Sequence, residues 1–298
     1  MSLELLAQAA SHPAFDPTPI PASLAACHVP FELLQSDDLE TGIAERLRDY
    51  GRIALVGPPG CGKSSVARYV MALKGDGLAP IWIDVASEGD RIAGTRGFLE
   101  ILISQLVRHA QRAGRLQPDE RRRLLTSSTP IDQLPSEERT TKLQLGGDVW
   151  LLKGEIANEV TRIVRGADAY RTTDEFRSAA RDVLALIAAS ELVPVLVADD
   201  TDRILRVAGD EEALERRFNG FFGEVVREIA EQLECGLLIA VHDDYVTRAG
   251  YREMTDGMFE SVRIPAITQE EHVGAIITSR ASFSMTTRRG AACSRRRL

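Results

Sequence analysis

The residues around Lys63 have the types and spacing that a phosphate-binding loop needs. The loop reads Gly57-Pro58-Pro59-Gly60-Cys61-Gly62-Lys63-Ser64, and Ser65 follows it. Glycines at these positions let successive backbone N–H groups surround phosphate oxygens. We expect Lys63 to reach the β- and γ-phosphates, as a binding and a catalytic residue, and Ser64 to offer its hydroxyl to Mg²⁺. The segment therefore predicts a nucleoside triphosphate site that is lined by residues 57–65.

Two carboxylates, Asp199 and Asp200, end the apolar run that begins at Val193. A carboxylate at the end of a buried strand can hold Mg²⁺ through its water shell, and a second one can orient or deprotonate an attacking water. We assign the metal role to Asp199, together with Ser64, and the catalytic role to Asp200. Paired aspartates after a strand also cap helices, and this alternative stays open.

A further apolar run, residues 236–241, ends in His242 and Asp243. The carboxyl ends of parallel strands meet at one edge of a sheet, where ligands bind, so either residue is a candidate to contact the γ-phosphate. A solvated strand end is the alternative. Arg248 and Arg252 are candidates for an arginine that reaches the phosphates of a neighbouring subunit in a homo-oligomer, or else they are surface residues.

Adenine is the expected base. Guanine-specific proteins with such a loop carry a DxxG switch and an NKxD base-reading motif, and neither motif occurs in this sequence. ATP and Mg²⁺ are therefore the predicted cofactors.

The elements that must position these residues alternate between short apolar runs and helical stretches. Strands are predicted at residues 52–56, 81–85, 193–198, 236–241 and 262–264, and helices at residues 39–50, 64–73, 98–112 and 218–233. This alternation predicts an α/β fold with a five-stranded parallel sheet flanked by helices. The glycine loop lies directly between a strand and a helix, which is where the Walker A pattern must lie.

The chain divides into three predicted parts. Residues 1–30 form a proline-rich lead-in segment, residues 31–268 an ATPase domain with an insertion at about 113–170, and residues 269–298 a truncated lid with a basic tail. Within the insertion, Gly146-Gly147-Asp148 separates β-prone arms and favours a β-hairpin. Two helices disturbed by glycines are the alternative.

The composition indicates a globular chain with an acidic body. The 298 residues are 44% hydrophobic with a net charge of −8, and five arginines lie in residues 281–298 without any acidic residue, so residues 1–280 carry −13. An acidic body does not favour nucleic acid as a partner, although Arg121-Arg122-Arg123 and the arginine tail keep it open. No apolar stretch is long enough to cross a membrane and the cysteines show no CxxC pairing, so we expect a cytoplasmic protein with free thiols.

Together these segments resemble the AAA+ and STAND-like branch of P-loop ATPases over residues 31–280. The resemblance rests on GPPGCGKSS, VLVADDTDR, GLLIAVHDDY and SVRIPAITQEE. The run that begins at Asp199 is similar to the DDLDR of KAP-type NTPases, and residues 264–268 resemble the strand-to-lid junction of initiator-type AAA+ proteins. The resemblance implies a parallel sheet in the order 5-1-4-3-2, a polar sensor after the fourth strand, and ATP-dependent assembly or switching.

The chain departs from that family pattern at two places. Asp200 stands where AAA+ enzymes usually have Glu, which puts fast hydrolysis in doubt, and the lid that normally follows the last strand is almost absent. A second sensor arginine is therefore not assigned.

Three functional hypotheses follow. The first is an ATPase whose hydrolysis drives the assembly or remodelling of a protein partner. The second is a STAND-like signalling switch with slow turnover, and the third is a nucleic-acid-binding initiator-type ATPase.

Overall fold

The computed structural model describes residues 25, 27–31, 38–85, 89–115, 172–201, 211–247, 249–255, 257–265, 270 and 272–280. The expected β-hairpin of the insertion, Arg248 and the basic tail lie outside the described residues.

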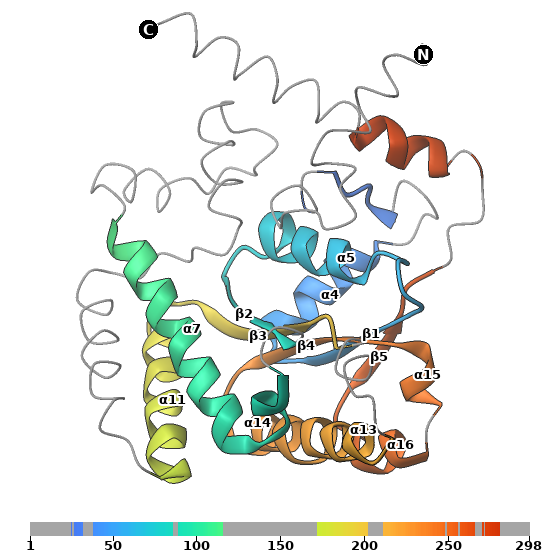
Figure 1. The fold of residues 1–298 in the computed structure, drawn as a ribbon. Helices are drawn as coiled ribbons and strands as arrows, with labels where there is room; N and C mark the ends of the chain where they lie inside the picture. Colours follow the sequence, from blue (N-terminus) through green and yellow to red (C-terminus); the bar gives the residue numbers. More distant parts are fainter. Residues whose placement is uncertain are drawn as a thin grey trace, which may run out of the picture.

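A five-stranded parallel sheet forms the centre of the molecule, as the alternation of apolar runs and helical stretches predicts (Figure 1). Its strands are β1 (Arg52–Val56), β2 (Leu78–Asp84), β3 (Val193–Asp199), β4 (Gly236–Val241) and β5 (Glu260–Arg263). The strand order β2-β3-β4-β1-β5 is the order 5-1-4-3-2 read from the opposite edge.

The two outer strands differ most from their predicted bounds. β2 begins at Leu78, three residues before the predicted start, and includes Pro80. Proline has no N–H to donate to a neighbouring strand, and an outer strand tolerates this because one of its sides is unpaired. The inner strand β3 contains a proline too, Pro194, next to its first residue. β5 begins at Glu260, and three of its four residues are exposed, so it carries little of the apolar pattern that marks an inner strand.

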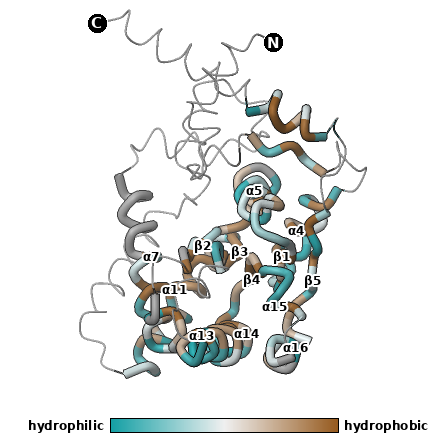
Figure 2. The backbone as a smooth tube through the Cα atoms, turned by 45° about the vertical axis from the view of Figure 1, so that its right-hand side comes forward, coloured by the Kyte–Doolittle hydropathy of each residue, from teal (hydrophilic) through white to brown (hydrophobic). Residues whose placement is uncertain are grey.

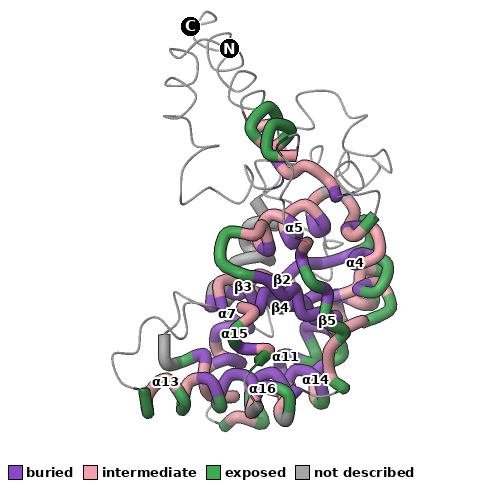
Figure 3. The backbone as a smooth tube through the Cα atoms, turned by 90° about the vertical axis from the view of Figure 1, so that its right-hand side faces the viewer, coloured by how far each residue is buried: buried purple, intermediate pink, exposed green. Residues whose placement is uncertain are grey.

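Helices cover both faces of the sheet (Figures 1 and 2). On one face α4 (Leu39–Arg48), α5 (Lys63–Tyr69) and the π-helical η2 (Val70–Lys74) bury Ile43, Leu47 and Val66 against the strands. On the other face lie α7 (Thr95–Arg115), α11 (Thr173–Ala188), η6 (Asn219–Val225) and α14 (Val226–Gln232). The three inner strands β1, β3 and β4 are almost wholly buried between these layers (Figure 3).

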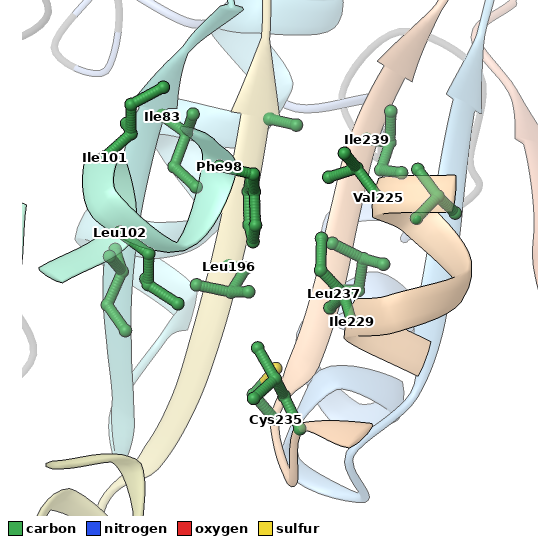
Figure 4. Packing of buried hydrophobic residues seen from close by; sticks show 14 of the residues in the cluster. Ile83, Phe98, Ile101, Leu102, Leu196, Val225, Ile229, Cys235, Leu237 and Ile239 are labelled. Carbon is green, nitrogen blue, oxygen red and sulfur yellow. The ribbon is translucent and has the colours of Figure 1, made fainter. Parts of the chain in front are cut away.

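The larger core lies on the second face. Phe98, Ile101 and Leu102 of α7 pack over β2 and β3, while Val225 and Ile229 pack over β4 (Figure 4). Shorter elements complete this side of the molecule: η3 (Gly89–Ala93), α13 (Glu211–Phe218), α15 (Asp243–Val246) and α16 (Ala249–Thr255).

Helix α11 was not among the predicted elements. Its sequence carries a clear start signal, because Thr172 accepts a hydrogen bond from the N–H of Glu175 and the Glu175 side chain accepts one from the N–H of Thr172. Its buried residues then recur at helical spacing, from Phe176 to Ile187.

Among the described residues, no helix is both long and apolar enough to cross a bilayer.

We predict that Gly220→Ala lowers the free energy of unfolding by about 1–3 kcal/mol, because a Cβ at this buried position would overlap the carbonyl oxygen of Ala93. Gly42 of α4 is the matched control, since no atom lies within 4 Å of a Cβ built there. Gly42→Ala should raise the free energy of unfolding by about 0.5–1 kcal/mol. Urea unfolding measures both, and an equally stable Gly220→Ala variant would contradict the close packing of η6 against η3.

Candidate functional site

The loop between β1 and α5 has a backbone that requires glycine. Gly60 and Gly62 have φ angles of 79° and 102°, in the left-handed region that other residues rarely adopt, and Gly62 stands directly before the first residue of α5. At Gly57 a Cβ would come within 2.6 Å of the Cys61 sulfur. The glycine spacing thus reflects the curvature of a loop that folds back on itself.

Lys63 lies inside this loop and is only 7% exposed. Its Nζ donates hydrogen bonds to the carbonyl oxygens of Gly57 and Pro58, at 2.7 and 3.0 Å. Burying an ammonium group is costly unless its donors are satisfied. Here the loop carbonyls satisfy them, so that the charge is held at the centre of the curved backbone.

Asp199, at the end of β3, and Ser64, in α5, are in direct contact. Side chains alternate between the faces of a strand, so Asp199 follows Val195 and Val197 onto the face that α5 covers. The Ser64 hydroxyl donates a hydrogen bond of 2.8 Å to Asp199 Oδ1, and the N–H of Asp200 donates to the same oxygen at 2.9 Å. The structure therefore brings together the two residues that we assigned to the metal, although they are 135 positions apart.

Asp200 leaves the strand in a left-handed conformation, with a φ of 56°. Such an angle is uncommon outside glycine, and aspartate is among the residues that tolerate it. The next residue, Thr201, is fully buried, and its hydroxyl donates to the carbonyl oxygen of Ala240 in β4. This bond attaches the turn that contains Asp200 to the neighbouring strand. Thr201 was not among the site residues predicted from the sequence.

His242 and Asp243 also lie at this edge of the sheet. The N–H of Gly57 donates to the carbonyl oxygen of Val241 at 3.2 Å, so the end of β4 adjoins the start of the loop. His242 caps α15, where its Nδ1 accepts a hydrogen bond of 3.0 Å from the N–H of Asp244. Asp243 Oδ1 lies 3.3 Å from Nη1 of Arg263 at the end of β5. Both residues have local partners, and a contact with the γ-phosphate stays a prediction.

The lead-in segment supplies a contact that we did not predict. His28 Nδ1 lies 3.0 Å from the hydroxyl of Ser65, directly after the loop. A single histidine in a proline-rich stretch gives no recognisable signal in the sequence, because its partner is set only by the tertiary fold. Of the two arginine candidates, Arg252 is exposed on α16, and Arg248 lies outside the described residues.

The described residues at this edge offer two oxygen donors, the hydroxyl of Ser64 and the carboxylate of Asp199. Among the described residues, no group of three or more His, Cys, Asp or Glu side chains is placed to hold a metal ion. Magnesium keeps several of its waters and commonly takes one or two protein ligands beside substrate phosphates. Ser64 and Asp199 match that requirement.

The described cysteines differ in accessibility, and none of the three is in a disulfide. Burial raises the pKa of the Cys27 thiol to about 11 and that of Cys235 to about 12. Cys61, in the loop, is partly exposed.

Comparison of the chain with protein-family models, curated proteins and solved structures gave no match.

We predict that iodoacetamide at mildly alkaline pH alkylates Cys61 much faster than Cys27 or Cys235, because only the thiolate reacts and the two buried thiols stay protonated. Mg-ATP should slow the reaction at Cys61 by occupying the loop. Peptide mass mapping measures each site separately, with Cys235 as the internal control. Alkylation of Cys61 at the same rate with and without saturating Mg-ATP would contradict a nucleotide in the loop.

Proposed function

We propose that this chain is an ATP-binding P-loop ATPase that uses the binding and hydrolysis of Mg-ATP to drive the assembly or remodelling of a partner. The observation that carries the proposal is the 2.8 Å hydrogen bond between Ser64 and Asp199. It joins the two sequence patterns that were independently expected to hold one metal ion. The sheet order and the left-handed glycines of the loop support the same conclusion.

Each residue of the site then has a role in the proposed reaction. The backbone N–H groups of residues 60–65 surround the phosphates, and Lys63 supplies a positive charge to the β- and γ-phosphates. Ser64 and Asp199 would hold the magnesium ion, which would supply positive charge beside the phosphate oxygens. Asp200 orients or deprotonates the water that attacks the γ-phosphate.

A slow-turnover signalling switch is the second candidate function. The geometry of Asp200 favours it, because the side chain is shorter than Glu and starts from a left-handed backbone that Thr201 ties to β4. A carboxylate in such a turn can move little toward the attacking water.

The third candidate, a nucleic-acid-binding ATPase, is distinguished by a salt-dependent affinity for DNA.

A neighbouring copy of the chain completes the proposed site if it supplies an arginine. Arg252 is exposed on α16 and is available for this role in a homo-oligomer. The protein partner on which the ATPase acts is not specified by the site.

We predict that Lys63→Ala raises the Kd for Mg-ATP by about 10- to 100-fold or more, the worth of hydrogen bonds to a charged group, while the protein stays folded. Lys74→Ala is the matched control, because Lys74 ends η2 and its ammonium group lies 3.9 Å from a carboxylate oxygen of Asp38 in a partly exposed ion pair. Isothermal titration measures both affinities. An unchanged affinity in a folded Lys63→Ala variant would refute the assignment of the nucleotide site.

We predict different kinetic effects for the two aspartates. Asp199→Asn should weaken Mg²⁺-dependent binding and hydrolysis together, because it alters the metal ligand. Asp200→Asn should leave the Kd for Mg-ATP unchanged and lower kcat by about 10²- to 10⁴-fold, because its interaction is made mainly in the transition state. Steady-state phosphate release and titration separate the two effects, and hydrolysis at the unmutated rate by Asp200→Asn would show that Asp200 is not the base.

Asp200→Glu distinguishes the two candidate functions with the same assay. The longer side chain brings the carboxylate closer to the attacking water. A faster turnover than in the unmutated chain supports the slow switch, whereas a slower turnover supports an ATPase whose site is already adapted to Asp200.

A further inference from the structure

A chain of buried polar contacts links the lead-in segment to the helix that follows the loop. His28 Nε2 lies 2.7 Å from Glu40 Oε1, and His28 Nδ1 lies 3.0 Å from the hydroxyl of Ser65. The N–H of Phe31 donates to the same Glu40 oxygen at 3.0 Å. The side chains of His28 and Glu40 are only 6% and 0% exposed. Polar groups buried this deeply are costly without partners, so the contacts define a specific arrangement.

The network also fixes which ring nitrogen carries the proton. A carboxylate only accepts hydrogen bonds, so His28 Nε2 donates to Glu40. In the neutral ring Nδ1 accepts from the Ser65 hydroxyl, and in the protonated ring Nδ1 donates to the Ser65 oxygen. In either state His28 joins Ser65 to Glu40.

His28 holds α5 at two points of its surface. Besides the hydroxyl of Ser65, its ring lies 4.5 Å from the ring of Tyr69, measured between centroids. Residues four apart lie on the same side of a helix, so both contacts are on one face of α5. Ser65 belongs to the first turn of α5, next to Ser64, whose hydroxyl faces Asp199.

The lead-in segment has a second attachment at the other end of the described chain. The hydroxyl of Ser279, in the helical residues 272–280, donates to the carbonyl oxygen of Cys27 at 3.3 Å. Residues 27 and 28 are thereby held between that helix and α5 (Figure 1).

We propose that His28 is a positioning residue of the nucleotide site: through the Ser65 hydroxyl it sets the first turn of α5 and thereby the direction of Ser64 toward Asp199. The inference rests on the proposed ATP-binding function and adds the lead-in segment to the site. Loss of the bond to Ser65 lets the first turn of α5 rotate, and nucleotide affinity falls although Lys63 and the backbone N–H groups that face the phosphates are chemically unchanged.

The test is a double-mutant cycle on the Kd for Mg-ATP, measured by titration of the full chain. Ser65→Ala removes the hydroxyl and leaves the pair of His28 and Glu40 in place, and His28→Ala removes the bridge. Each variant should raise Kd by about three- to tenfold, the effect of one lost hydrogen bond. The double variant should raise it no further than the larger single effect, because both remove the same interaction. Additive effects would overturn the inference, since Ser65 and His28 would then act separately.

Two further variants separate positioning from stability. His28→Asn places an amide near the position of Nδ1 but does not reach Glu40, so it should lower the melting temperature while keeping Kd within about twofold of the unmutated value. Ser190→Ala is the matched serine control. Ser190 donates a hydrogen bond to the carbonyl oxygen of Leu186 just before β3 begins, and this is the end of the strand opposite to the candidate site. It should leave Kd unchanged. If Asn weakens binding as much as Ala, the role of His28 is structural and the inference is overturned.

The reference variant Lys63→Ala separates this inference from the proposed function. If the unmutated chain binds Mg-ATP and Lys63→Ala does not, but Ser65→Ala and His28→Ala bind as tightly as the unmutated chain, only the inference fails. An unmutated chain that binds no nucleotide overturns both.

Discussion

The parallel pairing of β1, β3 and β4 is the constraint on which the rest of the structure depends. Val56 pairs with Val241, and Ala198 pairs with Ile239, so these strands end at one edge of the sheet. Parallel strands need helical connections that cover both faces, and such strands are apolar along most of their length. Polar residues of these strands therefore lie at or just beyond the strand ends, where the glycine loop, Asp199 and His242 are found.

Much of this arrangement follows from the sequence, because it depends on local patterns. The apolar runs specify the three inner strands to within one residue. They do not specify which face of β3 is covered by α5, because β3 is apolar on both faces. The loop conformation follows equally from its glycines, since Gly60 and Gly62 adopt angles that few other residues accept.

The remaining features depend on contacts between distant segments. Thr201 and His28 belong to stretches without periodicity, and their partners, Ala240 and Ser65, are 39 and 37 positions away. Buried polar or charged residues in the described part of the chain are Glu40, Lys63, Thr201 and Thr255. The first three lie in or next to the candidate site, where each side chain is hydrogen-bonded to the backbone of another segment or of the loop.

Pro80 has a consequence for the behaviour of the sheet as a surface. β2 is an outer strand, and outer strands offer unpaired N–H and C=O groups against which a strand of another molecule can align. Because Pro80 lies in the middle of β2 and has no N–H, an added strand would lose a hydrogen bond at the centre of its length. Pro80, which lies just before the predicted start of β2, thus also discourages edge-to-edge aggregation. In such aggregation the sheets of separate molecules join into a continuous sheet.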